Sequence, residues 1–421
     1  MRIGLAFPKS TFLEDPMTMP PLGLWYLAAQ LEAQGHTTDF RALDVDPFYE
    51  DGECDQVWVS ATSPQMAEVR RLGAIVAGWT KTRTVLGGAG PWARPEACVG
   101  LGYSVVVAGE ADHPNTVRAL VAGGDGIQRP AITTGKSMDW VLPPVRRWDG
   151  AYHYSLNDRA GQAHRTTTLF TSRGCPMACA FCESGRNGVI WDRAVRYEPV
   201  ALVEAQLREI AERGHTAAMF YDDILPLNKP RTLALLAVLP QYVKAWRCFL
   251  RTDVIIQQGG FDYLRQMAES GLVEVLAGVE SADNRIKANI HKGTTIEQDT
   301  QVLRWCKQLG IKFKASFILG LPGEDADSLA RTRDWILAER PDRADVNALI
   351  PMPGTPITNS HDFEGNAYDV SWEETLPEEW FYKSKGRGAS VLVRTKALSS
   401  ADIAAFRATL IEQIDAAGIP Y

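Results

Sequence analysis

Short runs of β-forming residues alternate with helical patterns along most of this chain, and that alternation constrains its fold more than any other feature. Strands separated by helices build parallel sheets, because a parallel neighbour requires a crossover connection. The first series of such units fills residues 1–125. Its five expected strands are Ile3–Phe7, Thr37–Leu43, Gln56–Ser60, Thr82–Leu86 and Ser104–Ala108. We therefore predict a doubly wound α/β domain, which binds its ligand beyond the carboxyl ends of the strands.

Helical patterns and glycine-containing loops complete this first domain. The expected helices are residues 20–31, Met66–Gly78 and Arg94–Gly100. The loops that follow the strands are Pro8–Pro16, Ala61–Gln65, Gly87–Gly90 and the pair Gly109 and Glu110. Gly87 and Gly88 would let a ligand approach the backbone closely, although a glycine turn after a strand explains them equally well.

A second series of βα units begins at Arg165. Its six expected strands are residues 167–172, 217–221, 246–251, 274–279, 312–319 and 345–350. Five helical patterns lie between them, at residues 199–213, 229–239, 261–270, 296–309 and 328–340. Six such units predict a partial (β/α)6 barrel over residues 165–360, with its active site at the carboxyl ends of the strands. Residues 126–164 carry several Pro, Gly and aromatic residues, which indicates a packed linker. Residues 361–421 form a small C-terminal segment, whose final helix is capped at Ser399 or Ser400.

Three of the seven cysteines fall in one loop, directly after the first strand of the second series. Cys175, Cys179 and Cys182 have the spacing C-x3-C-x2-C. Three thiolates can hold three irons of a cubane cluster, and the missing fourth cysteine leaves one iron open for another ligand. Buried packing cysteines and a zinc site are the alternatives, but zinc sites usually have paired C-x2-C knuckles or a nearby His. Three is an odd number, which argues against disulfides. We interpret Cys248 and Cys306 as packing residues.

Every further motif of the second series falls where an expected strand ends. The motifs are Tyr221-Asp222-Asp223, Arg251-Thr252-Asp253, Gly278-Val279-Glu280-Ser281, Leu319–Glu324 and Pro351–Pro356. Charged and glycine-rich residues at this end of a barrel indicate catalysis or ligand binding rather than stability. Structural roles stay open for some of them: Arg251 can pair with Asp253, Asp222 or Asp223 can cap the next helix, and Glu280 can hold a neighbouring loop.

In this order, the motifs resemble the radical SAM superfamily, and more narrowly its branch with an N-terminal cobalamin-binding-type domain. The resemblance covers residues 1–360 and is most specific at the three cysteines. Further support comes from Lys292-Gly293-Thr294-Thr295 and Gly320–Glu324 in the barrel, and from Pro20–Leu24 in the Rossmann-like N-terminal domain.

The resemblance implies a [4Fe–4S] cluster on Cys175, Cys179 and Cys182, covered by Phe181. The open iron would bind S-adenosylmethionine (SAM), which an electron from the cluster would cleave to methionine and a 5′-deoxyadenosyl radical. The expected contacts are Asp222 or Asp223 for the SAM ammonium, Arg251 for its carboxylate, Glu280 and Ser281 for the ribose or ammonium, and Leu319 and Gly320 for the adenine. No catalytic residue is assigned.

Cobalamin is the third implied cofactor. The D-x-H-x-x-G motif, which supplies a histidine ligand to cobalt, is absent after the first strand, so cobalamin would bind without that ligand. Other members of the branch keep this domain as a scaffold and bind none. The expected contacts lie in the loops after the third, fourth and fifth strands: Ser60, Thr62, Gly87, Gly88, Gly109 and Glu110.

Composition and charge limit the classes of partner and the cellular compartment that we expect for this chain. A net charge of −7 and a pI near 5.6 over 421 residues argue against a nucleic-acid substrate. The sequence has no apolar run long enough for a membrane span and no secretion signal, so we expect a cytoplasmic enzyme. A small molecule is the expected substrate, and a reductase or flavodoxin-type protein the expected electron donor. The substrate pocket is expected between the domains, lined by Tyr152, Tyr154, Trp191, Met352 and residues 372–382.

Three functions are open at this stage. The first is a cobalamin-dependent radical SAM methyltransferase that methylates an unactivated carbon of a small molecule or natural product. The second is a cobalamin-free radical SAM dehydratase, epimerase or cyclase. The third is a non-catalytic iron–sulfur scaffold, against which the many polar strand ends argue.

Overall fold

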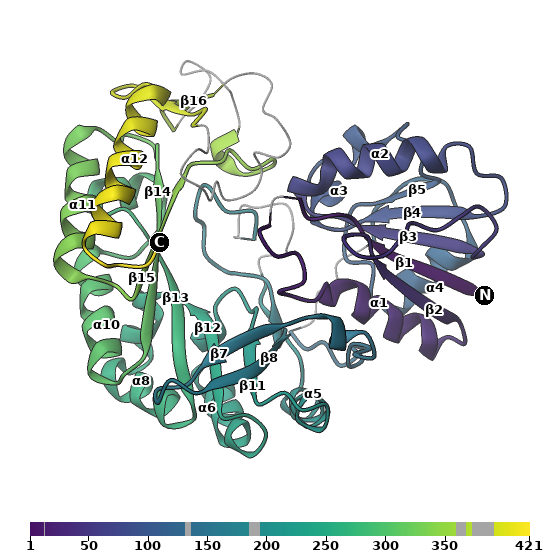
Figure 1. The fold of residues 1–421 in the computed structure, drawn as a ribbon, viewed down its shortest axis with the longest axis horizontal. Helices are drawn as coiled ribbons and strands as arrows, with labels where there is room; N and C mark the ends of the chain where they lie inside the picture. Colours follow the sequence, from purple (N-terminus) through teal and green to yellow (C-terminus); the bar gives the residue numbers. More distant parts are fainter. Residues whose placement is uncertain (12, 131–135, 185–193, 359–367, 373–390) are drawn as a thin grey trace. The chain divides into compact units, whose positions relative to one another are not determined.

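The structure is a computed structural model that describes residues 1–11, 13–130, 136–184, 194–358, 368–372 and 391–421 (Figure 1). Contacts divide these residues into two compact units. The first unit comprises the described residues of Met1–Tyr154 and Arg196–Gln206, and the second unit the others. Helix α5 (Val200–Glu212) passes from the first unit into the second. Each unit is built around one mainly parallel sheet.

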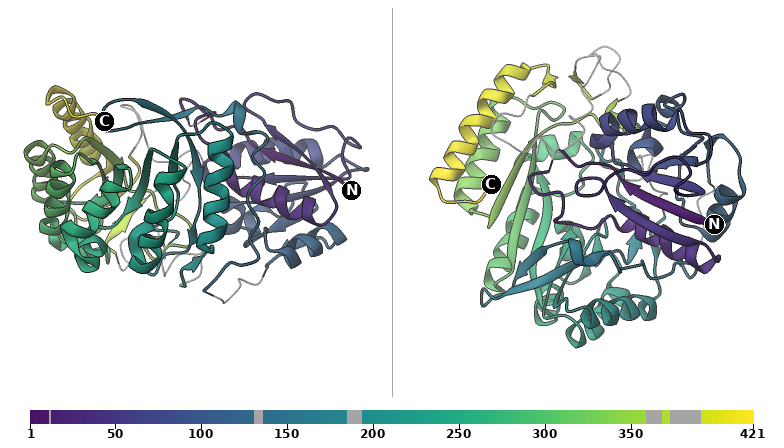
Figure 2. Two further views of the ribbon diagram at one scale, coloured as in Figure 1. Left: turned by 90° about the horizontal axis from the view of Figure 1, so that it is seen from below. Right: turned by 45° about the vertical axis from the view of Figure 1, so that its right-hand side comes forward.

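The sheet of the first unit has six parallel strands in the order β2-β1-β3-β4-β5-β6. The strands are β1 (Arg2–Phe7), β2 (Thr37–Ala42), β3 (Gln56–Ser60), β4 (Arg83–Gly87), β5 (Val105–Val107) and β6 (Gly126–Gln128). The helices are α1 (Leu22–Ala33), α2 (Met66–Val76), α3 (Ala89–Ala93) and α4 (Pro114–Ala122). In Figures 1 and 2, α2 and α3 cover one face of this sheet, and α1 and α4 the other. The direction of the order changes between β1 and β3, where doubly wound sheets bind ligands.

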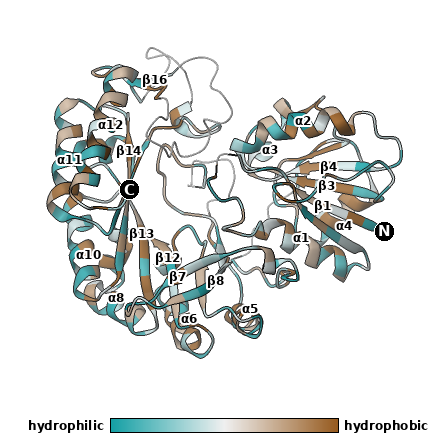
Figure 3. Cartoon of the chain, viewed as in Figure 1, coloured by the Kyte–Doolittle hydropathy of each residue, from teal (hydrophilic) through white to brown (hydrophobic). Residues whose placement is uncertain are grey.

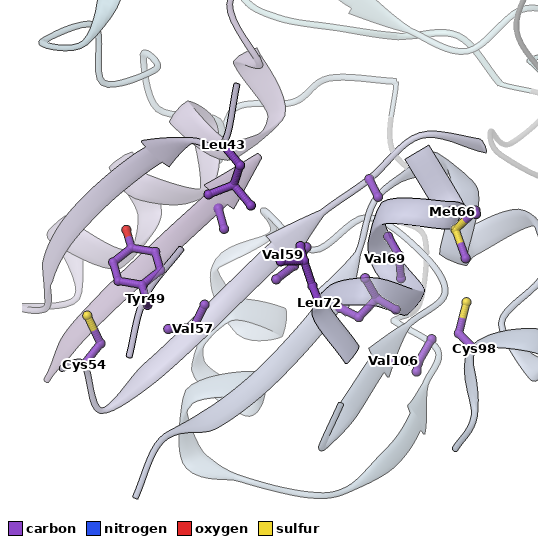
Figure 4. Packing of buried hydrophobic residues seen from close by; sticks show 13 residues of the cluster. Leu43, Tyr49, Cys54, Val57, Val59, Met66, Val69, Leu72, Cys98 and Val106 are labelled. Carbon is purple, nitrogen blue, oxygen red and sulfur yellow. The ribbon is translucent and has the colours of Figure 1, made fainter. Parts of the chain in front are cut away.

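The core beneath α2 is built from alternate residues of the central strands. Val57 and Val59 of β3 cluster with Val69 and Leu72 of α2, as Figure 4 shows, and Figure 3 shows β3 as a hydrophobic segment. Side chains on one face of a strand repeat every second residue, which is the pattern that predicted this strand. Two cysteines without a predicted role belong to the same cluster: Cys54 and Cys98.

Two helices of the first unit differ from the sequence prediction. A helix is predicted over Arg94–Gly100, but the structure has α3 before it and a single 3-10 turn (Glu96–Cys98) within it. Pro95 is the reason, because the residue before a proline disfavours the helical conformation and α3 therefore ends at Ala93. Helix α4 is not predicted, although Pro114 occupies its first position, where proline is common.

The sheet of the second unit curls into an open barrel with the order β15-β14-β13-β12-β11-β8-β7 (Figure 1). Its strands are β7 (Tyr154–Asn157), β8 (Ala163–Leu169), β11 (Ala217–Phe220), β12 (Ala245–Leu250), β13 (Leu272–Glu280), β14 (Lys312–Leu319) and β15 (Arg343–Ala348). The six strands from β8 to β15 are parallel, which confirms the predicted partial barrel.

The stretch predicted as a linker contributes a strand to each sheet. β6 joins the first sheet and β7 the second. A tight turn, in which Asp158 N–H donates to the Gln162 carbonyl at 2.9 Å, folds β7 back beside β8. The strands are only three and four residues long, which is too short for periodicity to reveal them.

Helices cover the outer face of the second sheet. They are α6 (Lys229–Val238), α7 (Thr252–Gln258), α8 (Gly260–Glu269), α9 (Asn284–Asn289), α10 (Ile296–Gln308), α11 (Ala326–Glu339) and α12 (Ser400–Ala416). Figures 1 and 2 show α6, α8, α10 and α11 along this face. Ring contacts identify the side chains that face outward: Phe317 of β14 lies 5.7 Å from Trp335 of α11. The residues that alternate with such outward positions, including Ser316, line the inner face.

Shorter elements complete the described chain. They are strands β9 (Ser172–Arg173), β10 (Arg196–Tyr197), β16 (Val370–Ser371) and β17 (Arg394–Thr395), and the 3-10 turns Ser63–Gln65, Asp149–Ala151, Leu225–Leu227, Leu239–Gln241 and Pro356–Thr358. The C-terminal helix begins as predicted, because the Ser399 side chain accepts the Asp402 N–H. Arg407 of α12 donates to the Val346 carbonyl at 3.1 Å, so this helix packs on β15.

Candidate iron–sulfur and SAM site

Asp222 accepts hydrogen bonds from the residues that begin the cysteine loop, which follows β8. Its carboxylate accepts the Thr171 N–H at 2.8 Å, the Thr171 hydroxyl at 2.7 Å and the Ser172 hydroxyl. The side chain is enclosed, and burial raises the pKa of Asp222. Asp222 was predicted to be one of two possible contacts for the SAM ammonium, but in this structure it holds the chain that leads to the cysteines.

Two backbone hydrogen bonds fix the middle of the same loop. The Ala180 N–H donates to the Ile290 carbonyl at 2.9 Å, at the end of α9. The Ala180 carbonyl accepts the Ile357 N–H at 3.2 Å. The loop is therefore tied to two segments that follow different strands of the barrel, which limits its movement beside the strand ends.

Burial disfavours the free thiolate form of two of the three cysteines of the loop, Cys175 and Cys182. Cys175 and Cys179 are buried and Cys182 is half-buried. Burial raises the pKa of Cys175 to about 11 and that of Cys182 to about 12. Metal binding offsets this cost, because the ligand must be deprotonated and the metal supplies the positive charge. None of the chain's seven cysteines, all of which are described, forms a disulfide, in agreement with the prediction.

The donor set fits a cubane cluster with one open iron. Within the described residues, no three His, Cys, Asp or Glu side chains converge on a position where a single metal ion would touch all of them. A cubane requires no such position, because each cysteine binds a different iron. The remaining cysteines, Cys248 and Cys306 among them, are buried elsewhere, which confirms those two as packing residues.

Arg251 follows β12 on the inner face of the barrel and reaches the cysteine loop. Its Nη1 donates to the Cys179 sulfur at 3.5 Å. Nε and Nη2 donate to the two carboxylate oxygens of Asp253 at 3.1 and 3.0 Å, and Nη2 also donates to the Lys292 carbonyl. Of the two roles that the sequence leaves open for Arg251, pairing with Asp253 is the one that the structure displays.

Glu280 occupies an unusual backbone conformation where β13 ends. Its φ is 65°, in the left-handed region that non-glycine residues rarely adopt, and the register with β14 shifts at this point. Such strain is concentrated at functional sites. The Glu280 carboxylate pairs with Lys292 Nζ at 2.7 Å, and both side chains are buried. Gly278 leaves room for this pair, since a Cβ there would collide with Glu280 and come within 2.7 Å of Lys292 Nζ.

Lys292 is the functional-site residue to which sequence reasoning assigned no role. The signal was present, because Lys292 opens a motif that supports the family resemblance. Burial lowers the pKa of Lys292, but Glu280 and Cys179 outweigh burial, so the pKa is raised and the ammonium stays charged. What the sequence could not show is that residues 12 positions apart form this pair.

Asp223 faces the cysteine loop. It is half-buried, unlike its neighbour Asp222, and it accepts the backbone N–H of Gly174. Burial raises the pKa of Asp223 to about 6. Of the two adjacent carboxylates, Asp223 is therefore the one with surface available to a ligand.

Three other predicted SAM contacts are buried and touch other parts of the protein. Ser281 is fully buried and its hydroxyl accepts the Asp283 N–H at 3.2 Å. Leu319 is fully buried in the barrel wall. Gly320 is also buried, and a Cβ on it would lie 2.8 Å from the Val393 side chain. These three residues support the strand ends, and their contact with SAM stays a prediction.

The glycine loop of the first unit packs on a neighbouring loop. Gly88 has a φ of 98°, and a Cβ there would lie 2.7 Å from the Ala61 nitrogen. The absence of a Cβ at Gly88 thus allows this close packing of the two loops, and the approach of a ligand there stays a prediction. Gln65 also donates to the Pro8 carbonyl at 2.6 Å, so the loops after β1, β3 and β4 meet at one end of the sheet.

Glu110 is engaged in a buried ion pair rather than facing outward. Its two oxygens accept from the two Nη atoms of Arg196 at 2.6 and 2.7 Å. The other predicted cobalamin contacts in this unit retain exposed surface: Ser60, Thr62, Gly87, Gly88 and Gly109. Their role stays a prediction.

The residues predicted to cover the cluster or line a substrate pocket have different outcomes. Phe181 is half-buried next to Cys182, and its covering role stays a prediction. Tyr152 is buried against Trp25, with ring centroids 5.7 Å apart, and so belongs to the core of the first unit. Tyr154, Met352 and Trp372 are half-buried. Trp191 and residues 373–382 lie outside the described residues.

Two family models match separate parts of the chain. The B12 binding domain matches residues 11–119, and the Radical SAM superfamily matches residues 169–336. The protein is a radical SAM enzyme with a B12-binding domain. The two matches fall within the regions predicted for these domains, residues 1–125 and 165–360, and they agree with the predicted classes of cofactor.

Relatives of this radical SAM enzyme include methyltransferases and a cyclase. An uncharacterized methyltransferase of Pyrococcus horikoshii is 25% identical over 81% of this chain and 78% of its own. The anaerobic magnesium-protoporphyrin IX monomethyl ester cyclase of Cereibacter sphaeroides is 26% identical over 64% of this chain and 44% of its own. The bacteriochlorophyllide d C-12(1)-methyltransferase of Chlorobaculum tepidum is 22% identical over 61% and 55%. The chain thus spans about half the length of the last two relatives.

Solved structures share the fold of this radical SAM enzyme. The radical SAM methyltransferase TsrM from Kitasatospora setae, solved with cobalamin and a [4Fe–4S] cluster, has a TM-score of 0.73 and 15% identity over 99% of this chain and 88% of its own. The cobalamin-dependent radical SAM enzyme OxsB has a TM-score of 0.64 and 18% identity over 80% and 51%. Among the described helices, none is both long and apolar enough to cross a membrane.

Proposed function

We propose that this enzyme is a cobalamin-dependent radical SAM methyltransferase that methylates a carbon atom of a small molecule or natural product. The observation that carries the proposal is the union, in one chain, of a loop with three cysteines at an open barrel and a B12-binding domain. The names of the methyltransferase relatives and the fold shared with TsrM support it.

The residues at the strand ends have defined roles in this proposal. When bound, the [4Fe–4S] cluster on the three cysteines supplies the electron that cleaves SAM to methionine and a 5′-deoxyadenosyl radical, and cobalamin supplies the methyl group. Asp223 would accept the SAM ammonium, because its carboxylate faces the cysteine loop and keeps exposed surface. Glu280 would accept hydrogen bonds from the ribose, since Lys292 holds its carboxylate in one orientation.

Anaerobic reconstitution tests the proposed function. The protein is supplied with iron, sulfide and hydroxocobalamin, reduced with titanium(III) citrate or a flavodoxin-type donor, and incubated with SAM. We expect four irons and one cobalamin per chain, release of 5′-deoxyadenosine, and S-adenosylhomocysteine, which is left when SAM donates its methyl group. 5′-Deoxyadenosine without bound cobalamin or S-adenosylhomocysteine would instead identify a dehydratase, epimerase or cyclase. An intact cluster that never cleaves SAM would identify an iron–sulfur scaffold.

A pair of cysteine variants controls this experiment. Cys182→Ala removes one predicted ligand, and we expect it to lose the four-iron cluster and all 5′-deoxyadenosine. Cys248→Ala removes a cysteine buried in β12 outside the loop, and we expect it to keep both. Equal iron contents in the two variants would show that Cys182 is not a ligand.

A further inference from the structure

Most N–H groups of Arg251 donate hydrogen bonds to the protein, so its guanidinium cannot bind a carboxylate of SAM through two parallel hydrogen bonds. A guanidinium carries five N–H donors. Nε donates to Asp253, Nη2 donates to both Asp253 and the Lys292 carbonyl, and Nη1 donates to the Cys179 sulfur. A bidentate grip on a carboxylate requires two adjacent N–H groups, and only one N–H of Arg251 makes no hydrogen bond to the described residues. The side chain is also 8% exposed, which leaves little surface for a ligand.

A second cation interacts electrostatically with the same cysteine. Lys292 interacts electrostatically with Cys179 and with Arg251, and it pairs with Glu280 at 2.7 Å. Each cation is paired with a carboxylate, Arg251 with Asp253 and Lys292 with Glu280. Arg251 also donates one N–H to the Cys179 sulfur. This arrangement orients positive charge toward one cluster ligand in a site that excludes most water.

We propose that Arg251 is a positioning residue of the iron–sulfur cluster, which hydrogen-bonds the Cys179 sulfur and, together with Lys292, sets the reduction potential of the cluster rather than binding SAM. The inference rests on the proposed function, because it requires the cluster. Hydrogen bonds to cluster sulfurs and nearby positive charge favour the reduced state, which carries one more negative charge. The carboxylates of Asp253 and Glu280 act in the opposite direction and limit this effect.

An EPR-monitored redox titration without SAM tests the proposal. Titanium(III) gives one electron to the cluster and becomes titanium(IV), and no bond or proton changes. We expect Arg251→Gln to move the midpoint to a more negative potential, with roughly a tenfold lower ratio of reduced to oxidised cluster at a fixed potential, equivalent to about 59 mV for one electron. Arg251→Lys, which keeps the charge but loses the fork, should recover part of the shift. Asp253→Asn removes the opposing charge and should move the midpoint in the positive direction.

Arg247→Gln is the matched control. Arg247 lies in β12, an even number of residues before Arg251 and so on the same inner face, and it is likewise buried and paired, with Glu274 at 3.0 Å. It lies four residues earlier, on the order of 13 Å along the strand, so we expect the wild-type midpoint. Iron content and circular dichroism confirm that each variant holds its cluster and fold.

Each outcome of the titration decides one question. Equal midpoints for wild type, Arg251→Gln and Arg247→Gln would overturn the inference alone. If Arg251→Gln then also lost the change in the EPR spectrum that SAM causes, Arg251 would bind the SAM carboxylate as the sequence predicts. A wild-type protein that assembles no four-iron cluster would overturn the proposed function, and this inference with it.

Discussion

Glu324 carries a buried carboxyl group that accepts hydrogen bonds from backbone N–H groups. One of its oxygens accepts the N–H groups of Gly320 and Leu321 at 2.5 and 3.3 Å, and the other has no hydrogen-bond partner within the described structure. The side chain is enclosed, and burial raises its pKa to about 8. Near neutral pH, Glu324 is therefore largely protonated and shapes the loop after β14 as a neutral acceptor.

We predict that Glu324 makes the protein less stable as pH rises. Its pKa in the folded protein, about 8, lies above the value of 4.5 that applies when it is unfolded. The folded state therefore binds this proton more tightly, and the stabilisation is complete below pH 4.5 and is lost as pH rises through about 8. Glu324→Gln cannot ionise and should remove this loss, which amounts to a few kcal/mol at about 1.4 kcal/mol per pKa unit. Urea unfolding of both proteins at acidic, neutral and alkaline pH measures it. The same loss in both would contradict the prediction.

Gly278 allows a second residue-scale prediction. In Gly278→Ala, the new methyl group would occupy the space of the Glu280–Lys292 pair. Both obstructing groups are the ends of flexible side chains, so we expect the fold and the cluster to survive while the pair moves and the affinity for SAM falls about tenfold, or 1.4 kcal/mol. Titrating SAM into the reduced protein and following its EPR spectrum measures the affinity.

Gly23→Ala is the control for this variant. Gly23 is exposed within α1, and nothing lies within 4 Å of a Cβ placed there. Alanine in a helix is more stable than glycine by about 0.5–1 kcal/mol, so the control should raise the melting temperature slightly and leave SAM affinity unchanged. Equal SAM affinities in the two variants would show that the displaced pair has no part in binding.

At the scale of elements, a buried ion pair joins the loop after β5 to strand β10. The side chains of Glu110 and Arg196 are 6% and 1% exposed, and they meet through two hydrogen bonds. Removing one partner of such a pair leaves the other charge buried, which costs about 3–5 kcal/mol. This pair connects segments 86 residues apart within the first unit.

We predict that Glu110→Gln destabilises the protein by about 3–5 kcal/mol, measured by urea unfolding. The control is Glu96→Gln, which breaks the exposed pair between Glu96 and Arg129 and should cost less than about 1 kcal/mol. Both Glu110 oxygens are already engaged by Arg196, so the loss of cobalamin affinity should not exceed what the loss of stability explains. If the two variants lose the same small amount, the Glu110–Arg196 pair does not support the fold as argued.

At the scale of the whole molecule, the two predicted cofactor sites lie in different compact units. The cysteine loop belongs to the second unit, whereas the B12-binding match falls in the first. We therefore predict that Cys179→Ala loses the cluster but keeps bound cobalamin. Iron analysis and the visible spectrum of cobalamin measure both in one sample. Loss of both cofactors together would mean that the cluster is required for the B12-binding domain to hold its ligand.

Much of this architecture was predictable, because periodicity is a local property. The strand β3 was predicted with the bounds that the structure has, and the six parallel strands of the barrel were predicted in their correct order. The failures are local too: Pro95 ends α3 early, and strands β6 and β7 are too short to show a period. A pattern of period two needs more residues than these strands contain.

By itself, the sequence determined which cysteines form the candidate cluster site and that charged residues gather at the ends of the barrel strands, because both follow from spacing along the chain. The tertiary structure decided what each charged residue touches. Asp222 holds Thr171 across 51 positions, and Arg251 reaches Cys179 across 72. Residue types indicate that a carboxylate or a guanidinium will find a partner, but only the folded chain decides whether that partner is a ligand or another part of the protein.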